Sequence, residues 1–331
     1  MANLRAGLIG LGMMGRHHAR VLASLPGVDL VAVADPGGDV HGVSGGRPVE
    51  ADIEALIGHG LDYCMVAVPT VYHEAIGLAL AEAGVHAMIE KPLAQDTASS
   101  TRVAEAFEAQ GLVGAVGHIE RYNPALQQAR SRIEAGELGE VYQVITRRQG
   151  PFPARIADVG VVKDLGTHDI DLTAWVTQQE FVSVAARTTH RSGREHEDMV
   201  SVVGQLSLGT ITNHLVNWLT PFKERLTVIT GEKGSFVADT LTADLTFHAN
   251  GKTEQAWDAI SKFRGVSEGD VVRFAIAKPE PLRTEHEQFR DAVLGQDADI
   301  VTMAQGLRTV RVAEACLESA ATGTTVALDV S

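Results

Sequence analysis

The sequence has 331 residues, of which 45% are hydrophobic and 21% charged, and its formal net charge at pH 7 is −14. This length exceeds one ordinary core and predicts two domains, while the acidic charge argues against nucleic acid or an anionic membrane as a general partner. Two cysteines, Cys64 and Cys316, form neither a disulfide framework nor a zinc cluster, so we expect a reducing, cytoplasmic location. No apolar run is long enough to predict a membrane span.

The first part of the sequence alternates short apolar runs with helical segments. The runs are rich in Val and Ile and predict buried strands at residues 4–9, 29–34, 62–68, 85–89 and 112–117. Helices are predicted at 15–25, 72–83 and 96–110, the last opening on Asp96 as a capping residue. This alternation predicts a doubly wound parallel sheet in an α/β domain over residues 1–122. The glycine-rich residues 36–50 predict a loop or a shortened helix in place of a full crossover helix.

From residue 123 the pattern changes to alternating polar and apolar positions. A helix at 124–135 is followed by predicted strands at 141–147, 182–189, 199–206, 210–218 and 225–230. Two helices at 285–294 and 303–321 and a strand at 325–330 complete the sequence. Period-two patterning predicts an α+β second domain over residues 123–331, with a large, mostly antiparallel open sheet.

The motif Gly10-Leu11-Gly12-Met13-Met14-Gly15 follows the first predicted strand and opens the first predicted helix. In this context Gly10 permits a tight turn, Gly12 lets a pyrophosphate approach, and Gly15 lets helix and strand pack closely. Asp35 ends the second strand, where a carboxylate binds an adenosine ribose and repels a 2′-phosphate. The motif therefore predicts a dinucleotide site that favours NAD over NADP, although Arg47 in the glycine-rich stretch could still fold back toward a phosphate.

Lys91 follows the predicted strand 85–89, within Glu90-Lys91-Pro92. Ligands bind at the carboxyl ends of parallel strands, so Lys91 is a candidate to give or take a proton beside the nicotinamide. Taken alone, a lysine at a strand end is more often a surface charge. The sequence does not decide whether the bond to Pro92 is cis.

Asp164, His168 and Asp171 form a second group of titratable side chains. A helix starting near Gly166 would place His168 in its first turn, with the two carboxylates within reach. Such a histidine suits general-base catalysis, with its tautomer fixed by one acid; the alternative is a helix cap beside a packed histidine. No second histidine lies at ligand spacing, so no metal site is expected.

Together these motifs resemble the glucose–fructose oxidoreductase/inositol dehydrogenase (Gfo/Idh/MocA) family. The order of the glycine motif, Asp35, Val68-Pro69-Thr70-x-x-His73, Glu90-Lys91-Pro92 and the Asp164–His168 group is similar along essentially the whole sequence. The resemblance implies a Rossmann domain, a substrate domain that also forms the oligomer interface, and catalysis by Lys91, His168 and Asp164.

The resemblance also implies two sets of binding residues. It places cofactor contacts on Gly10, Gly12, Met13, Met14, Gly15, Asp35, Pro69, Thr70, His73, Glu90, Lys91 and Arg121. It places substrate contacts on Lys91, Asn123, Arg148, Arg155, Lys163, Asp164, Thr167 and His168.

The segments 117–124 and 150–155, running on to the His168 group, look like those of UDP-N-acetylglucosamine 3-dehydrogenases. Residues 121–163 carry seven Lys/Arg against four Asp/Glu, so Arg147, Arg148, Arg155 and Lys163 could meet a diphosphate. The expected activity is hydride transfer between NAD(P) and a sugar secondary alcohol, by a homodimer or homotetramer. Alternatives are a polyol dehydrogenase of the inositol type, a keto-deoxysugar reductase, or a non-catalytic dinucleotide-sensing regulator.

Overall fold

The structure is a computed structural model that describes residues 2–153, 159–251 and 268–329. It divides into two compact units: Met1–Ile119 with Glu280–Glu314, and Glu120–Pro279 with Ala315–Ser331. Within the described ranges, every helix is too short or too polar to cross a membrane.

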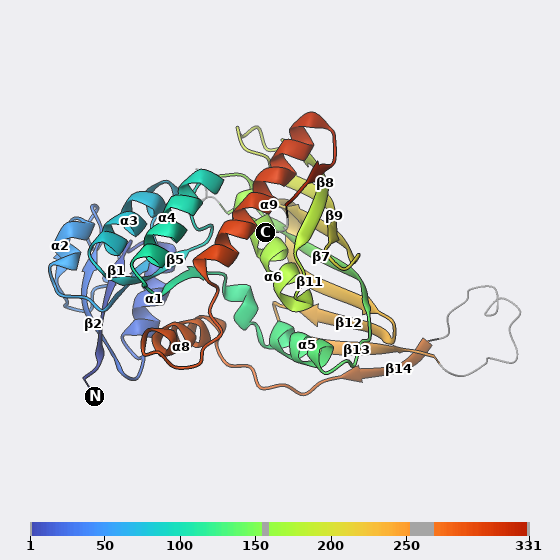
Figure 1. Ribbon diagram of the computed structural model, residues 1–331, viewed down its shortest axis with the longest axis horizontal. Coiled ribbons are helices and arrows are strands. Elements are labelled where there is room, and N and C mark those ends of the chain that lie inside the picture. The colour runs from blue at the N-terminus through green and yellow to red at the C-terminus, as the bar shows by residue number, and fades with distance from the viewer. Residues whose placement is uncertain (1, 154–158, 252–267, 330–331) are drawn as a thin grey trace, which may run out of the picture. The chain divides into compact units, whose positions relative to one another are not determined.

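The first unit is built on a six-stranded parallel sheet with the strand order β3-β2-β1-β4-β5-β6 (Figure 1). Its strands are β1 (Leu4–Ile9), β2 (Val28–Ala34), β3 (Val49–Glu50), β4 (Tyr63–Val66), β5 (His86–Glu90) and β6 (Gly114–Gly117). Its helices are α1 (Met13–Leu22), α2 (Ile53–Ile57), α3 (His73–Glu82), α4 (Thr97–Ala109) and α8 (Pro281–Val293). The doubly wound parallel sheet expected from the alternation is confirmed.

Local sequence accounts for these elements. Every residue of β4 is buried, as a central parallel strand requires. Asp96 caps α4 in a capping box, accepting a hydrogen bond from the Ser99 N–H at 2.7 Å. The glycine-rich stretch 36–50 forms no helix, only turns and the short β3, so the predicted loop is confirmed.

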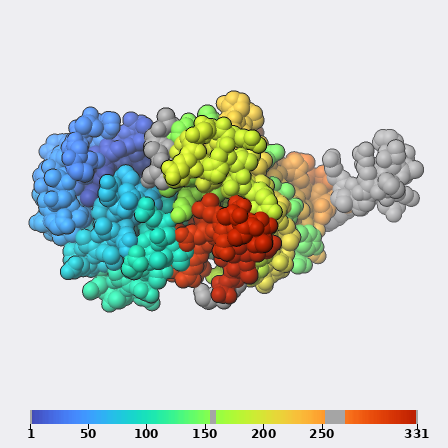
Figure 2. Space-filling model, turned by 90° about the horizontal axis from the view of Figure 1, so that it is seen from above, coloured from blue at the N-terminus to red at the C-terminus, as the bar shows by residue number. Residues whose placement is uncertain are grey.

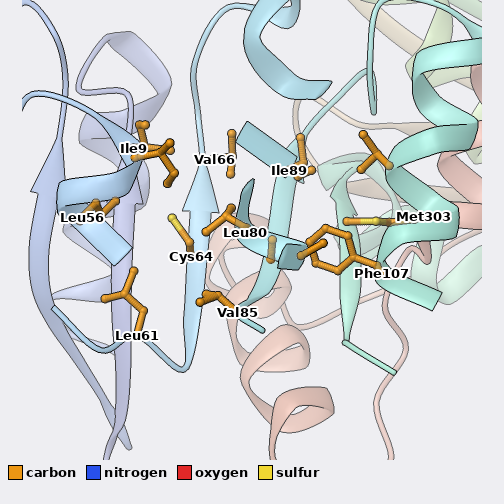
Figure 3. Close-up of a cluster of buried hydrophobic side chains, with 14 of the residues drawn as sticks. Ile9, Leu56, Leu61, Cys64, Val66, Leu80, Val85, Ile89, Phe107 and Met303 are labelled. Atoms are coloured by element: carbon orange, nitrogen blue, oxygen red, sulfur yellow. The ribbon is translucent and has the colours of Figure 1, made fainter. Parts of the chain in front are cut away.

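One face of this sheet packs into a hydrophobic cluster that includes Ile9, Val66 and Ile89 (Figure 3). Met303 joins the cluster from α9 (Met303–Thr322), whose first turns belong to this unit. A Cβ at Gly114 would lie 2.6 Å from the Met303 sulfur, so the glycine in β6 leaves the space that the Met303 side chain occupies. The expected second domain of 123–331 included residues 280–314, but the structure packs them with the first unit because they bury its apolar surface.

The second unit is built on a nine-stranded sheet of order β14-β13-β12-β11-β7-β10-β9-β8-β15. Its strands are β7 (Val141–Pro151), β8 (Phe181–Thr189), β9 (Met199–Leu206), β10 (Ile211–Asn217), β11 (Leu219–Gly231), β12 (Gly234–Asp239), β13 (Asp244–Asn250), β14 (Glu268–Arg273) and β15 (Val326–Ala327). Adjacent strands are antiparallel except β7 and β10, which confirms the predicted mostly antiparallel sheet.

The two faces of this sheet differ. Helices α5 (Pro124–Glu134) and α6 (Thr167–Thr177) pack on one face, where Leu126, Trp175 and Phe236 share a hydrophobic cluster. On β9 buried and exposed residues alternate, as expected for a sheet with one covered face. The red atoms of the last residues lie beside the yellow-green atoms of the β8–β9 region in Figure 2, in agreement with the pairing of β15 with β8.

Candidate active site

The glycine motif forms the turn from β1 into α1, and each of its glycines has a distinct environment. Gly10 has φ +93°, and a Cβ there would lie 2.4 Å from the Ala67 carbonyl oxygen. A Cβ at Gly15 would lie 1.8 Å from the Gly10 carbonyl oxygen, so this glycine lets helix and turn touch. A Cβ at Gly12 would meet nothing within 4 Å. Gly12 therefore faces open space, as a position that a pyrophosphate approaches should.

The start of α1 has the chemistry of an anion site. Gly12 is its N-cap and supplies no side-chain cap, and no acidic residue occupies the first turn. The first N–H groups of the helix are thus open to a phosphate, which the helix dipole favours. Met13 is exposed and Met14 half-buried at this end. These residues fit the dinucleotide expected from the sequence.

Asp35 follows β2, and its carboxylate binds the backbone of the glycine motif. Its carboxylate accepts hydrogen bonds from the Leu11 N–H and the Gly37 N–H, each at 2.8 Å. Each carboxylate oxygen has two lone-pair sites, so capacity remains for ribose hydroxyls. The Arg47 guanidinium donates to the Leu30 carbonyl at 2.7 Å and the Ser44 carbonyl at 2.9 Å. Arg47 therefore stabilises its own loop, which removes the main sequence argument for NADP.

His73 joins two strand-end loops. Its Nδ1 lies 2.9 Å from the Pro92 carbonyl oxygen and its Nε2 3.0 Å from the Val68 carbonyl oxygen. Burial lowers the pKa of His73, against the pull of these carbonyls. Pro69 and Thr70 lie directly between, at a short 3₁₀ turn. A neutral ring has one N–H, so it donates to one of these two carbonyls while its other nitrogen faces the second. The structure thus shows His73 holding this loop, and its predicted contact with the cofactor stays a prediction.

Glu90 and Lys91 end β5 at the same sheet edge as the glycine motif and Asp35. The Glu90 carboxylate accepts the Lys91 backbone N–H at 3.1 Å and lies 2.9 Å from Nε2 of His18. Although burial acts to raise it, the hydrogen bond with His18 and the charge of Lys91 hold the pKa of Glu90 below its ordinary value. The Lys91–Pro92 bond is cis. No sequence motif indicates the contact of Glu90 with His18, because it joins positions 72 residues apart.

Asp164 and His168 lie on one continuous helical segment of the second unit. The segment opens earlier than the predicted start near Gly166: a π-helical turn spans Val162–Gly166 and leads into α6. Asp164 is buried, and His168 is partly exposed. Glu197 accepts a hydrogen bond from the Val162 N–H at 3.0 Å and so satisfies the start of this turn. Single-turn π segments are frequent at functional sites.

Two more predicted residues near this segment have structural contacts. The Thr167 hydroxyl donates to the carbonyl of the partly buried Lys163 at 2.9 Å. Asn123 caps α5 by accepting the Ala125 N–H at 3.0 Å, and its amide donates to the Thr240 carbonyl at 2.9 Å. Their side chains thus fix local backbone, whatever else they contact.

The arginines expected to contact ligands are held by carboxylates. Arg121, expected at the cofactor, forms a buried bidentate pair with Asp171 through contacts of 2.8 and 2.6 Å. Asp171, one of the two carboxylates expected within reach of His168, gives both oxygens to this guanidinium. Arg148, expected at a diphosphate, is buried and pairs with Asp169 at 2.9 Å and Glu120 at 2.8 Å. Its positive charge is therefore already compensated, which argues against the diphosphate contact.

The positive charges of other arginines in residues 121–163 are also neutralised by carboxylates. Further arginines of this segment pair with carboxylates, as Arg130 with Glu134, Arg132 with Glu137 and Arg147 with Glu224. Arg155 lies outside the described residues. The expectation that this segment presents a basic surface to a diphosphate is thus not supported by the arginines that the structure describes. Across the same described ranges, no group of three or more His, Cys, Asp or Glu side chains is arranged to hold a metal ion.

Comparison with known proteins identifies both units. A model of an oxidoreductase family with an NAD-binding Rossmann fold, Gfo/Idh/MocA, matches residues 4–118, and a Gfo/Idh/MocA C-terminal domain model matches residues 126–237. A UDP-N-acetylglucosamine 3-dehydrogenase of Acidithiobacillus ferrooxidans is 33% identical over 216 residues, covering 64% of this chain and 66% of that protein. A scyllo-inositol 2-dehydrogenase (NAD(+)) of Bacillus subtilis is 32% identical over 192 residues, covering 55% of this chain and 56% of that protein.

Similarity in three dimensions extends along nearly the whole chain. The solved structure of the Acidithiobacillus ferrooxidans UDP-N-acetylglucosamine 3-dehydrogenase superimposes with a TM-score of 0.83 at 26% identity, covering 96% of this chain and 98% of that one. The glycine motif, Asp35 and the strand-end lysine lie within the first matched model, and Asp164 and His168 within the second. The chain is a member of the Gfo/Idh/MocA family of NAD-binding oxidoreductases.

Proposed function

We propose that this protein is an NAD-dependent oxidoreductase that transfers a hydride between the nicotinamide and a secondary alcohol of a sugar. The observation that carries the proposal is the shared edge of the parallel sheet, where the open Gly12 position, Asp35 and Lys91 all follow strand ends. NAD, when bound, supplies the electrophilic carbon that accepts the hydride. Binding would rest on the α1 N–H groups at the pyrophosphate and on Asp35 at the ribose.

The acid–base roles fall on three side chains. Lys91 polarises the reacting oxygen, His168 takes its proton, and Asp164 orients the His168 ring. Positioned acid–base groups typically contribute about 10²- to 10⁴-fold in rate. The family resemblance supports these roles, and the burial of Asp164 suits a carboxylate that orients a histidine.

For the substrate, we propose a nucleotide sugar such as UDP-N-acetylglucosamine, oxidised at its 3-position. The support is the similarity to a UDP-N-acetylglucosamine 3-dehydrogenase, at both the sequence and the structural level. The diphosphate contacts expected from the sequence for Lys163 and Arg155 stay predictions. A free polyol is the second candidate, supported by the similarity to a scyllo-inositol 2-dehydrogenase.

A substrate panel tests this assignment. UDP-N-acetylglucosamine, myo-inositol, scyllo-inositol and glucose are each supplied with NAD or NADP, and the absorbance of the reduced nicotinamide is followed. We expect turnover with NAD, with UDP-N-acetylglucosamine as the best substrate. Preference for an inositol would select the second candidate, and NAD binding without turnover of any sugar would favour a dinucleotide-sensing regulator.

We further propose a cytoplasmic homo-oligomer that assembles through the nine-stranded sheet. Support comes from the sheet face opposite α5 and α6, where Val203 and Ile211 are exposed on neighbouring strands and Ile145 lies partly buried beside them. Both cysteines are free and buried, which suits a reducing compartment. Sedimentation analysis would distinguish a dimer or tetramer from a monomer.

A further inference from the structure

A buried series of side chains connects the end of β5 with α1 and α8. Nε2 of His18 lies 2.9 Å from Oε1 of Glu90, and Nδ1 of His18 lies 2.9 Å from Nε2 of His286. Both histidines have an exposed fraction of 0%. Glu90, His18 and His286, here called the buried triad, belong to the same compact unit. The two histidines have no part in the proposed acid–base chemistry, so the triad requires its own explanation.

The triad reaches the backbone of Lys91 directly. While Oε1 of Glu90 contacts His18, its Oε2 accepts the Lys91 N–H at 3.1 Å. A Cβ at Gly117, on the neighbouring β6, would lie 3.3 Å from the Glu90 carboxyl carbon, so this glycine leaves the room that the side chain needs. Glu90 is therefore held on both oxygens. The peptide that precedes the Lys91 side chain is fixed by the same carboxylate.

The contacts dictate where the protons lie. Glu90 is ionised, because its hydrogen bond with His18 and the Lys91 charge outweigh its burial and lower its pKa. An ionised carboxylate only accepts, so Nε2 of His18 carries a proton. Burial holds the pKa of His286 well below its ordinary value, so its ring is neutral. Nδ1 of His286 is buried without a hydrogen-bond partner among the described residues, so the one proton of this neutral ring lies on Nε2, which donates to Nδ1 of His18.

A second acid lies beside the triad. Glu285 is buried, and neither of its oxygens has a hydrogen-bond partner among the described residues. Burial and the Glu90 charge raise its pKa well above the ordinary value, so Glu285 is a neutral acid. Glu90 therefore carries the single negative charge of this pair of carboxyl groups, as expected for two acids buried close together.

We propose that His18 and His286 are positioning residues for the reaction: they hold the Glu90 carboxylate, and through it the Lys91 segment, in register with the phosphate-binding helix. His18 lies on α1, one turn beyond Gly15. The helix proposed to receive the pyrophosphate and the strand end that carries Lys91 are therefore joined through Glu90 by two partly buried hydrogen bonds. This inference rests on the role proposed for Lys91. It assigns to α8 a part in the site, because its His286 donor completes the alignment of His18.

The test compares two amides at position 286. In His286→Gln the amide nitrogen reaches the place of Nε2 and keeps the donor to His18, whereas in His286→Asn it reaches only the place of Nδ1 and the donor is lost. We expect His286→Asn to lower kcat by about tenfold to a hundredfold, as small misplacements of catalytic groups do. His286→Gln should recover most of this loss. His17→Asn, on the adjacent and partly exposed position of α1, is the matched control and should retain wild-type kcat.

Two readouts separate a positioning role from general damage and from failure of the proposed function. NAD affinity, measured by fluorescence in the absence of substrate, should stay within about twofold in both His286 variants, since neither touches the glycine motif. The Lys91 backbone amide resonance in the NMR spectrum should move in His286→Asn and not in His286→Gln or His17→Asn. ¹⁵N imidazole spectra of the wild type should show the Nε2–H tautomer for both His18 and His286.

The NMR readouts need no substrate, so they stand even if every sugar fails and the proposed function falls. Wild-type kcat in a folded His286→Asn, or an unmoved Lys91 amide, would overturn the proposal. So would equal losses in the Asn and Gln variants, because both would then reflect packing alone. If His286→Asn does not fold, the imidazole tautomers of the wild type decide: an Nδ1–H form of His286 contradicts the proposal.

Discussion

At the scale of single residues, the glycine motif shows one residue type serving unrelated purposes. A side chain does not fit at Gly15, because its Cβ would lie 1.8 Å from the Gly10 carbonyl oxygen. At Gly12, in contrast, a Cβ would meet no protein atom within 4 Å. The first restriction is imposed by the fold, whereas the open position at Gly12 is where we propose that the pyrophosphate approaches. Sequence alone assigns both glycines to the same motif and does not separate these two constraints.

Alanine substitutions at these positions should therefore fail differently. Gly12→Ala should keep the wild-type melting temperature and lose NAD affinity by about tenfold or more, since the methyl group occupies the approach of the pyrophosphate. Gly15→Ala should lower the melting temperature itself, because helix and turn must separate. Thermal unfolding without NAD, followed by NAD titration, measures both effects. Equal destabilisation by the two substitutions would contradict this assignment.

The proposed acid–base residues make a second residue-scale prediction. Lys91→Ala and His168→Ala should each reduce kcat by about 10²-fold or more while leaving NAD affinity near the wild-type value. Steady-state kinetics with the best substrate of the panel and fluorescence titration with NAD provide the two numbers. Full activity in both variants would remove Lys91 and His168 from the mechanism.

At the scale of elements, regular patterns were predictable and long-range pairings were not. Local composition predicted five strands of the parallel sheet, because β1, β2, β4, β5 and β6 are apolar runs. It also predicted helix α4 from its capping residue. Strands β12 to β14 were not predicted. Polar residues from Asp239 to Thr242 interrupt the period between β12 and β13, and β14 is a short strand of which three of six residues are charged. The ion pair that neutralises Arg148 could not be predicted, because Asp169 is 21 residues away and no local pattern indicates the contact. Arg148 was therefore expected to contact a ligand. The buried triad was missed for the same reason, since His18 and His286 are 268 residues apart.

The helical segment that carries Asp164 and His168 depends on a single glycine. A Cβ at Gly160 would lie 2.0 Å from Oε1 of Glu197, the oxygen that accepts the Val162 N–H. Gly160→Ala should displace this carboxylate and leave the start of the π-helical turn unsatisfied, at a cost of about 1–3 kcal/mol. We expect a lower melting temperature and a lower kcat, with NAD affinity unchanged. Glu197→Gln, which keeps an acceptor oxygen, is the matched milder variant; unaltered kcat in Gly160→Ala would show that this turn does not position Asp164 and His168.

At the scale of the whole molecule, buried neutral histidines set the response to acid. Burial lowers the pKa of His214 to about 4, and it also lowers the pKa values of His73 and His286. An unfolded histidine takes up its proton near pH 6.5, so between pH 6.5 and about 4 the unfolded state binds more protons than the folded state. Stability should therefore fall as the pH decreases through this window. His214 alone accounts for a loss on the order of 3 kcal/mol.

Replacing His214 by asparagine tests this response. Its amide lies where Nδ1 now contacts the Thr146 hydroxyl at 2.8 Å, and it does not titrate. Melting temperatures at about pH 7 and about pH 5 should differ less for His214→Asn than for the wild type. An unchanged difference would mean that His214 is not a source of the acid sensitivity.

The reaction proposed for the whole molecule is a hydride transfer between two specific carbon atoms, a carbinol carbon of the sugar and C4 of the nicotinamide. The most direct measurement supplies NAD with UDP-N-acetylglucosamine or inositol deuterated at the carbinol carbons and analyses the nicotinamide by mass spectrometry. We predict deuterium in the reduced nicotinamide with the wild type, and its loss in Lys91→Ala. Reduced nicotinamide that carries no deuterium, or no reduced nicotinamide with any sugar tested, would contradict this hydride transfer.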